Sequence, residues 1–473
     1  MSSATAVRRT RTALAAPRRR SPRRTADVAT GIAGIGLGVI VGIELVTRTE
    51  VSGPGALLIE LSRWTGMVGT YLSLVVIFLI ARVPFVERNV GLDHMIAWHR
   101  RLGPIALMLI AAHVVLVTLG YAAAEATSYL GETWAFLTDF PWLLPATAGF
   151  ALMLVAGITS WRTARRRMKY ETWWVTHLYF YLAVALAFLH QLTLGQQFSS
   201  HPWARAIWIA LYVLTFGPLL VYRVLVPLYV SLVRHDLRVH AVVRENSSTL
   251  SVWIRGRNLD RLRAEGGQFF GWRFLTRDRW WQSHPYSLSA GPDPRYLRIT
   301  VKDLGDHSRG LAAVRPGTRV VAEGPYGIFT AGSRFTDRVV LVAGGVGVAP
   351  IRALLDELPR HVAVDVLYRA PREEALVLRE ELEQIARSRP GIRLRYLVGS
   401  RHDYPINART LLHLVPDVQR RDVYSCGPQP LVEAVREACD VLGLPDERVH
   451  DEGFSFQSPD YYAFSRMRKG ASR

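Results

Sequence analysis

Residues 99–113 read HRRLGPIALMLIAAH and residues 177–190 read HLYFYLAVALAFLH, so two apolar segments each begin and end with a histidine. The histidines are 14 residues apart in the first segment and 13 apart in the second. A helix rises about 1.5 Å per residue, so the imidazoles of each segment lie about 20 Å apart if both segments are helical. Four histidines at two matched levels predict two metal sites stacked along a pair of helices.

These two segments belong to a series of apolar stretches. The length of each is close to the about 20 residues that a helix needs to cross a membrane. The six stretches are 28–47, 57–81, 98–122, 141–161, 172–194 and 204–230. The connections at 82–101 and 162–169 are rich in Arg and Lys, whereas those at 125–140 and 193–202 contain neither. Because positively charged connections stay in the cytoplasm, we predict a multi-pass protein of the cell membrane with both termini cytoplasmic.

The third and fifth stretches cross the membrane in the same direction, so His99 and His177 are expected near its cytoplasmic face. His113 and His190 are then expected nearer the outside. Imidazole binds iron well, and a haem with two axial imidazoles takes one from each side, so we predict two b-type haems held by these four ligands. A single intramembrane histidine can instead hydrogen-bond to a neighbouring helix. Thirteen residues miss a whole number of turns by about 140°, so we expect a bulge, kink or tilt in the fifth stretch.

Arg63 is a charged residue inside the second apolar stretch, near its outer side. A charge within a membrane is costly, and its side chain therefore usually has a partner. In one interpretation Arg63 binds a propionate of the outer haem. In the other, the second helix is shorter and leaves Arg63 at the membrane surface.

The charge balance is strongly basic, with 58 Lys and Arg against 39 Asp and Glu and a net charge of +19. Such a balance is typical of nucleic-acid-binding proteins. Here, however, eight arginines lie in the first 24 residues and others cluster between apolar stretches. This layout predicts contact with membrane lipid and no nucleic acid. Residues 1–27 are predicted to form a disordered basic arm.

After Arg234 the pattern changes to short segments in which polar and apolar residues alternate, separated by Gly, Pro and Asp. These segments are 237–243, 249–254, 268–274, 296–301 and 318–322. Alternation with a period of two predicts a small antiparallel β-barrel over residues 233–333. Residues 284–287 read HPYS, in which an aromatic ring and a hydroxyl can cover a flavin ring and bond to its edge. The segment from Lys302 to Ser308 supplies a cation and a hydroxyl suited to a pyrophosphate.

Residues 334–456 alternate between buried strands and helices, which predicts an α/β nucleotide-binding domain followed by a tail at 457–473. Strands are expected at 338–343, 363–368, 393–398 and 422–425, and a helix at 351–358. The glycine-rich turn at 344–350 lets backbone N–H groups approach a pyrophosphate. The last strand ends in Cys426-Gly427-Pro428, where a small sulfur side chain can face a nicotinamide. Alternatively, Cys426 is a packed small hydrophobic residue.

Two cysteines are too few for an iron–sulfur cluster with four thiolates or for a zinc ribbon. The metal chemistry is therefore assigned to the histidines.

The order of these motifs resembles that of the ferric reductases and NADPH oxidases. The matching features are the histidine pairs, the HPYS motif, EGPYG at 323–327, the 344–350 turn, Cys426-Gly427-Pro428 and Glu452-x-Phe454-x-Phe456. The resemblance implies a membrane bundle of six helices at 28–232 that holds two haems. It also implies ferredoxin-reductase-type FAD and NAD(P) modules after that bundle.

The resemblance also implies residue roles. Cofactor-binding roles fall on Arg63, His284, Pro285, Tyr286, Ser287, Lys302, Ser308, Gly344, Gly345, Gly347, Arg369, Ser400, Arg401, Cys426 and Gly427. The residues implied to lie nearest the reacting rings, and therefore to be catalytic, are Tyr286, Ser287, Cys426 and Phe456.

Nucleotide preference depends on the pair Ser400-Arg401, which falls where related reductases bind a 2′-phosphate, with Arg369 as a second candidate. An arginine fork suits a phosphate dianion, so NADPH is favoured over NADH. A solvated surface arginine is the alternative.

The sequence departs from the family pattern at three positions. Lys302 replaces an arginine that is usual in the oxidases, and Phe456 is not a terminal residue. Val117 stands where the oxidases have another histidine, one turn after His113, and this puts oxygen in doubt as the natural acceptor.

The predicted function is transfer of electrons from cytoplasmic NADPH through FAD and two haems to an extracytoplasmic acceptor, with ferric chelate favoured. Three alternatives stay open. They are a superoxide-generating oxidase, an electron-delivery subunit for a partner outside, and a flavin diaphorase anchored by a bundle without haem.

Overall fold

The computed structural model describes residues 22–48, 50–90, 92–168, 170–303, 306–400 and 402–453. The chain divides into two compact units, one up to Leu220 and one from Val221 onward. The predicted arm up to residue 21, Arg401, Phe454, Phe456 and the predicted tail lie outside the described residues. The first helix begins at Pro22, so residues 22–27 are helical although they were expected in the arm.

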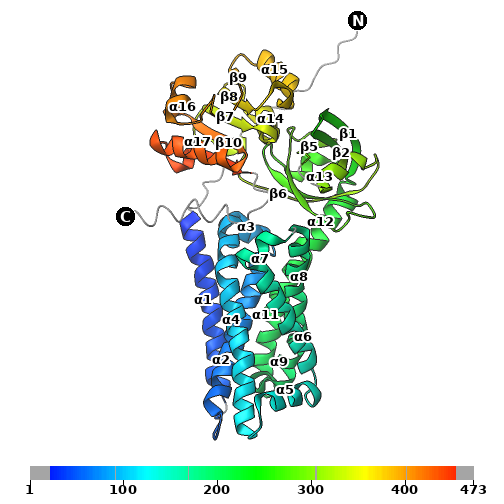
Figure 1. Ribbon diagram of the computed structural model, residues 1–473, viewed down its shortest axis with the longest axis vertical. Helices are drawn as coiled ribbons and strands as arrows, with labels where there is room; N and C mark the ends of the chain where they lie inside the picture. The colour runs from blue at the N-terminus through cyan, green and yellow to red at the C-terminus, as the bar shows by residue number, and fades with distance from the viewer. Residues whose placement is uncertain are drawn as a thin grey trace. The chain divides into compact units, whose positions relative to one another are not determined.

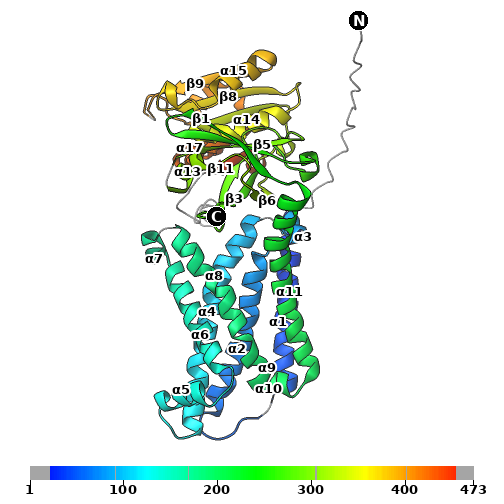
Figure 2. The same cartoon turned by 90° about the vertical axis from the view of Figure 1, so that its right-hand side faces the viewer.

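The first unit consists of long helices that run alongside one another in both ribbon views (Figures 1 and 2). The long elements are α1 (Pro22–Thr47), α2 (Ala56–Leu79), α4 (Leu92–Ala124), α6 (Leu143–Ser160), α8 (Tyr170–Leu186) with α9 (Phe188–Leu194), and α11 (Pro202–Leu220). The short elements are α3 (Pro84–Val90), α5 (Tyr129–Thr138), α7 (Arg162–Arg167) and α10 (Gln196–Ser199).

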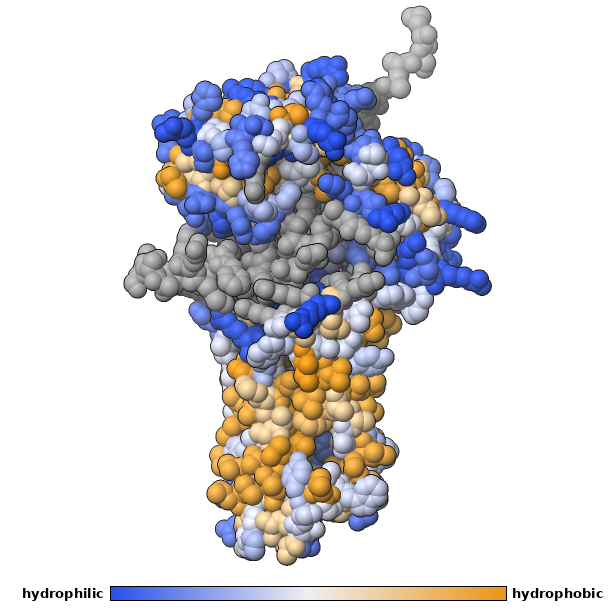
Figure 3. Space-filling model, in the orientation of Figure 1, coloured by the Kyte–Doolittle hydropathy of each residue, from blue (hydrophilic) through white to orange (hydrophobic). Residues whose placement is uncertain are grey.

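Six helices among the described residues are long and apolar enough to cross a membrane, as predicted. These spans are Asp27–Thr47, Ala56–Leu79, Met95–Ala124, Leu143–Ser160, Thr172–Leu194 and Pro202–Arg234. The bundle exposes apolar side chains on its outside, which Figure 3 shows in orange, and Met108, Val155 and Val213 are examples. An outward apolar surface of this kind suits lipid as the surrounding solvent.

The two kinds of connection lie at opposite ends of the bundle. The helices α3 and α7, from the two basic connections, are at one end, and α5, from a connection without Arg or Lys, is at the other (Figures 1 and 2). This arrangement is the alternation expected of helices that cross a membrane up and down.

The fifth span is interrupted at Ala187, between α8 and α9. The regular helical hydrogen-bond pattern stops there and resumes at Phe188. The interruption lies between His177 and His190, so the predicted irregularity of this helix is confirmed.

The second unit begins with the continuation of the sixth span. Val221–Leu225 (η1) and Tyr229–Arg234 (η2) are π-helical and flank the short α12 (Val226–Leu228). Pro227 lies within α12 and has no backbone N–H, so it cannot donate a helical hydrogen bond to the preceding turn.

The flavin-type part contains two three-stranded antiparallel sheets, ordered β1-β2-β5 and β4-β3-β6. The strands are β1 (Arg238–Asn246), β2 (Thr249–Arg255), β3 (Phe269–Phe274), β4 (His284–Ser287), β5 (Tyr296–Lys302) and β6 (Val320–Tyr326). Isolated pairings of Arg238 with Arg319 and of Leu288 with Ile299 link the sheets. The predicted strands are present, but the sheets are open, and closure into a barrel stays a prediction.

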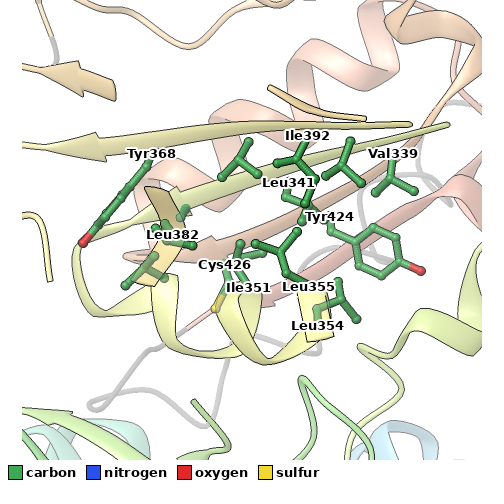
Figure 4. Close-up of a cluster of buried hydrophobic side chains, with 14 of the residues drawn as sticks. Val339, Leu341, Ile351, Leu354, Leu355, Tyr368, Leu382, Ile392, Tyr424 and Cys426 are labelled. Atoms are coloured by element: carbon green, nitrogen blue, oxygen red, sulfur yellow. The ribbon is translucent and has the colours of Figure 1, made fainter. Parts of the chain in front are cut away.

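The last part is a parallel five-stranded sheet in the order β11-β10-β7-β8-β9, with helices on both faces. The strands are β7 (Arg338–Gly344), β8 (Ala363–Ala370), β9 (Ile392–Val398), β10 (Asp422–Gly427) and β11 (Val449–Gly453). α14 (Val348–Glu357) and α15 (Arg379–Ser388) pack on one face, and α16 (Ala408–Leu414) and α17 (Gln429–Val441) pack on the other. Figure 4 shows the apolar cluster on the first face. The predicted α/β architecture is confirmed.

Candidate functional site

The clearest metal-site geometry is between His99 on α4 and His177 on α8. Their ring centroids are 6.0 Å apart and the ring planes are inclined by 74°. Two imidazoles that bind one metal ion through bonds of about 2 Å have centroids about 6 Å apart. The observed separation therefore fits two axial ligands of a single iron.

The hydrogen bonds of His99 and His113 leave one nitrogen of each ring available to a metal. Nδ1 of His99 lies 3.1 Å from the carbonyl oxygen of Val76, and Nδ1 of His113 lies 2.8 Å from that of Ser62. A carbonyl oxygen can only accept, so Nδ1 carries the proton in both rings and Nε2 keeps its lone pair. This is the tautomer that a metal-binding imidazole requires.

Ser160 imposes the same tautomer on His177. The Ser160 hydroxyl donates its single hydrogen to the carbonyl of Ala156, at 2.6 Å. Its oxygen must therefore accept from both remaining neighbours, Nε1 of Trp173 at 3.2 Å and Nδ1 of His177 at 3.1 Å. Nε2 of His177 thus stays unprotonated. The indole of Trp173 also stacks on the imidazole, with centroids 5.3 Å apart.

The other two predicted ligands come from the same two spans, His113 from α4 and His190 from α9. Gly66 makes room for His113, because a Cβ at Gly66 would lie 2.7 Å from its Nδ1. The structure thus brings His99 and His177 together, and the pairing of His113 with His190 stays a prediction.

The donor set fits a porphyrin better than a free ion. Within the described ranges, no three His, Cys, Asp or Glu side chains converge on one point, as they would around a free metal ion. Two imidazoles at each level fit an iron whose other four ligands belong to a porphyrin. The haems themselves stay a prediction.

Arg63 lies against the connection between the fifth and sixth spans. Its Nη2 donates to Oε1 of Gln196 at 2.9 Å. The neighbouring Gln197 donates to Glu44 at 2.7 Å, and the Glu44 carboxyl is fully buried. Sequence reasoning missed Glu44, although it is a charge within an apolar stretch. The propionate role of Arg63 stays a prediction.

The HPYS motif forms β4, which pairs with β3. Nε1 of Trp272 donates to the carbonyl of Tyr286 at 2.9 Å, and the Tyr286 and His284 rings stack with centroids 6.4 Å apart. Tyr286 and Ser287 are almost fully buried, whereas Pro285 is exposed. Burial raises the pKa of Tyr286, so its phenol is neutral and can donate a hydrogen bond.

Lys302 and Ser308 lie on either side of a short connection, part of which is outside the described residues. Lys302 ends β5 and is exposed. Ser308 is almost buried in α13 (Asp306–Gly310). Their contact with a flavin phosphate stays a prediction.

The glycines of the nucleotide module meet at the carboxyl ends of the neighbouring strands β7 and β10. From these two strands the sheet extends in opposite directions, to β8 and β9 on one side and to β11 on the other. A Cβ at Gly347 would lie 2.2 Å from the carbonyl oxygen of Cys426, and one at Gly427 would lie 3.0 Å from Cα of Gly344. Gly345 has φ +55°, and a Cβ there would meet no described atom within 4 Å. Such a switch point is where open α/β sheets bind ligands.

Two of the candidates for the 2′-phosphate, Arg369 and Ser400, lie at the same edge of the sheet, and Arg401 is outside the described residues. Arg369 of β8 lies opposite Gly344 of β7, and Ser400 lies two residues after the end of β9. The Ser400 N–H donates to Asp403 at 2.8 Å, and this hydrogen bond lowers the pKa of Asp403. Sequence reasoning missed this carboxylate beside the predicted phosphate site. The choice between NADPH and NADH stays a prediction.

Cys426 is fully buried in the apolar cluster of Figure 4. Burial raises the pKa of its thiol well above the usual value, so the sulfur is neutral. These observations favour the packed alternative, and contact with a nicotinamide stays untested.

Comparison with known families finds the same parts in the same order. Residues 65–188 match the ferric reductase like transmembrane component, residues 235–330 a FAD-binding domain and residues 341–437 an oxidoreductase NAD-binding domain.

Individual relatives match less than half of the chain. The reductase subunit of stachydrine N-demethylase from Rhizobium meliloti is 31% identical over 186 residues, which are 36% of this chain and 52% of that protein. An NADPH oxidoreductase of Mycobacterium tuberculosis is 28% identical over 232 residues, which are 46% of this chain and 59% of that protein. The chain spans about half the length of these relatives.

Among solved structures, the flavohem-like FAD/NAD-binding domain of nitric oxide dioxygenase from Vibrio cholerae is 22% identical. The match covers 46% of this chain and 97% of that chain, with a TM-score of 0.39. The three matched families follow one another in the order of a ferric reductase/NADPH oxidase-like fusion, so the chain is a membrane oxidoreductase in which a ferric-reductase-like transmembrane component precedes FAD- and NAD-binding domains.

Proposed function

We propose that this chain passes electrons from cytoplasmic NADPH, through FAD and two b-type haems, to an acceptor on the other side of the cell membrane. The observation that carries the proposal is the 6.0 Å separation of the His99 and His177 rings. When bound, FAD takes up a hydride and the haems carry single electrons, which is chemistry the polypeptide cannot supply.

The residues around the histidines orient the ligands. Val76 and Ser62 accept the Nδ1 protons of His99 and His113 through backbone carbonyls, and Ser160 accepts that of His177. Each ring is thereby held in one tautomer, and its Nε2 is left for iron. Such supporting contacts commonly change metal affinity by about 10- to 100-fold.

The nucleotide module would bind NADPH along the carboxyl edge of its sheet. Gly345 gives the pyrophosphate open access to backbone N–H groups at the start of α14. Arg369, Ser400 and Arg401 would surround the 2′-phosphate, and Arg supplies the fork that a phosphate dianion prefers.

We infer that the favoured acceptor is a ferric chelate. If His113 and His190 both held the outer haem, they would leave its iron no position for oxygen, and an acceptor would have to be reduced without binding to the metal. Arg63 provides a positive charge beside Gln196, and many ferric chelates are anionic. Val117 cannot donate a hydrogen bond to oxygen. The basic connections near α3 and α7 would face the cytoplasm.

The test uses the purified full chain in vesicles, supplied with haem and FAD. We expect two b-type haems per chain in the reduced-minus-oxidised spectrum and faster NADPH oxidation with ferric chelate than with oxygen. Arg63→Ala should slow the chelate reaction, and haem content is measured alongside because a propionate partner would also help to retain the haem. Stoichiometric superoxide that saturating chelate does not diminish would make the chain an oxidase instead. A preparation that binds FAD but no haem would instead make the chain a flavin diaphorase anchored in the membrane.

A further inference from the structure

The sixth span is longer than a membrane crossing requires. It runs for 33 residues, from Pro202 to Arg234. At about 1.5 Å per residue it is about 50 Å long, whereas the hydrocarbon core is about 30 Å thick. Residues 206–222 contain no Asp, Glu, Lys or Arg, and Arg223 is the next charge. We call residues 221–234 the helix-six tail, which belongs to the second compact unit.

A buried carboxylate of the flavin-type part binds this tail. Arg223 donates to Oε1 of Glu323, the first residue of the EGPYG motif, whose side chain is only 7% exposed. The Tyr326 hydroxyl donates to the same oxygen at 2.8 Å, and Nη2 of Arg273 lies 3.8 Å from the other oxygen. Two cations and a hydroxyl therefore meet one carboxylate that is shielded from water.

A second anchor lies two turns further along the tail. The hydroxyl of Ser231, which is fully buried, accepts from the N–H of Ala322 at 2.9 Å and lies 3.3 Å from the Ala322 carbonyl oxygen. Ala322 and Glu323 are consecutive residues of β6. The tail is thus bound to one strand at two points, 8 residues apart along the helix.

The strand that holds the tail belongs to the sheet that carries the flavin motif. β6 pairs with β3, where Glu323 lies opposite Gly271. β3 pairs with β4, where Phe270 lies opposite Tyr286. Adjacent strands are about 4.8 Å apart, so about 10 Å of hydrogen-bonded sheet separates the tail's anchor from the flavin motif.

We propose that Arg223 and Glu323 are positioning residues, which hold the flavin motif in a fixed orientation relative to the end of the sixth span. This inference rests on the proposed function. Hydride uptake from NADPH needs the two soluble modules and is independent of the tail. Passage of an electron out of the flavin depends on how the flavin motif is held, and the Arg223–Glu323 pair would hold it against the helix-six tail.

The energetics make the pair suitable for this task. Removing one partner of a buried ion pair leaves an uncompensated charge in a poorly hydrated site, which distorts the contact strongly. Exchanging the two residues restores an ion pair, but it places the new arginine beside Arg273, so the exchange is expected to recover only part of the contact. The variants Arg223→Gln and Glu323→Gln can therefore be compared with the exchange Arg223→Glu/Glu323→Arg. Arg338→Gln is the matched control, because its ion pair with Asp417 is exposed.

The experiment uses the full chain in lipid nanodiscs with its cofactors, and measures two rates. One is NADPH-driven reduction of a soluble dye that accepts from FAD, and the other is NADPH-driven haem reduction in a stopped-flow instrument. We expect Arg223→Gln to slow haem reduction by about tenfold or more, since misplacement by about 1 Å can cost that much, and to leave dye reduction within about twofold. The exchange variant should recover part of the loss, and Arg338→Gln should change neither rate.

A second readout needs no activity. Amide hydrogen exchange over residues 221–235 should rise in Arg223→Gln and Glu323→Gln in cofactor-free protein, and should stay unchanged in Arg338→Gln. Haem reduction at the normal rate in both single variants would overturn the inference, as would parallel losses in both rates. Absence of NADPH-driven haem reduction in the unmodified chain would overturn the proposed function itself and the electron-transfer role of the pair. Unchanged amide hydrogen exchange in both single variants would show that the pair does not hold the tail.

Discussion

The imidazoles of His99 and His177 meet edge to face with centroids 6.0 Å apart, and each directs its Nδ1 proton away from the other ring. The two proton acceptors come from different helices, Val76 from α2 and Ser160 from α6. Four helices therefore determine the orientation of one ligand pair. These contacts lead to predictions about haem retention.

Replacing a histidine of the second pair should remove one haem of two. We expect His113→Ala or His190→Ala to halve the haem content and to abolish most transfer to an external acceptor, while NADPH still reduces FAD. Pyridine haemochrome analysis per mole of FAD measures the change. His361→Ala, on an exposed side chain, is the control. If all four single variants of the paired histidines retained two haems per chain, the ligand assignment would be wrong.

Ser160→Ala should weaken haem binding at the His99–His177 level. The substitution removes the acceptor of both His177 Nδ1 and Trp173 Nε1, so the ring loses its enforced tautomer. We expect about 10- to 100-fold lower haem affinity, the usual effect of losing a supporting contact. Thr159→Ala is the matched control, because the Thr159 hydroxyl donates to carbonyls of its own helix. Equal haem titrations for the two variants would contradict the role of Ser160.

Gly66→Ala should impair the second level selectively. The added Cβ would lie 2.7 Å from Nδ1 of His113, so the ring must move away from the Ser62 carbonyl. We expect loss of the haem at that level with the first haem retained. Gly103→Ala, on α4, meets no described atom within 4 Å and should retain both haems. Normal haem content in Gly66→Ala would show that the ring position is not critical.

Arg401→Ala should weaken binding of NADPH far more than that of NADH. One charge-assisted contact with a phosphate contributes about 1.5–3 kcal/mol, which corresponds to about ten- to a hundredfold in affinity. Steady-state KM values for the two nucleotides, with a soluble dye as acceptor, measure the difference. Arg338→Gln serves again as the control. Equal losses for both nucleotides would place Arg401 away from the 2′-phosphate.

Asp422→Asn should destabilise the nucleotide module at neutral pH. Burial by itself raises the pKa of Asp422, but hydrogen bonds from His450, the Thr336 hydroxyl and the N–H groups of Phe335 and Thr336 outweigh it and lower the pKa. A carboxyl whose folded pKa is depressed stabilises the fold above its unfolded pKa of about 3.9, and the benefit is lost as the pH falls through the folded value.

We therefore expect the Asn variant to be less stable than the unmodified chain at pH 7 by about 1–3 kcal/mol, with a smaller difference at pH 4. Pulse proteolysis of the full chain at the two pH values measures it. A difference that grows toward low pH would contradict the sign of this argument.

The sequence by itself determined the features that depend on local period and composition. Stretches of about 20 apolar residues predicted six spans, and the spans of the structure agree with them within a few residues. Alternation predicted five strands of the flavin-type part, although it missed the strand formed by the HPYS motif. The spacing of 13 between His177 and His190 required an irregular helix, since the turn of an α-helix is the same in every sequence.

Only the tertiary structure decided which elements are neighbours. No periodicity shows that Ser160 lies within reach of His177, that Val76 offers its carbonyl to His99, or that Arg223 meets a carboxylate 100 residues later. Alternation also did not show which strands are neighbours, and the structure pairs them as β1-β2-β5 and β4-β3-β6. The physical reason is that the periodicity of apolar residues shows which side of a helix or strand is buried. Which other element packs against that side depends on how the whole chain folds.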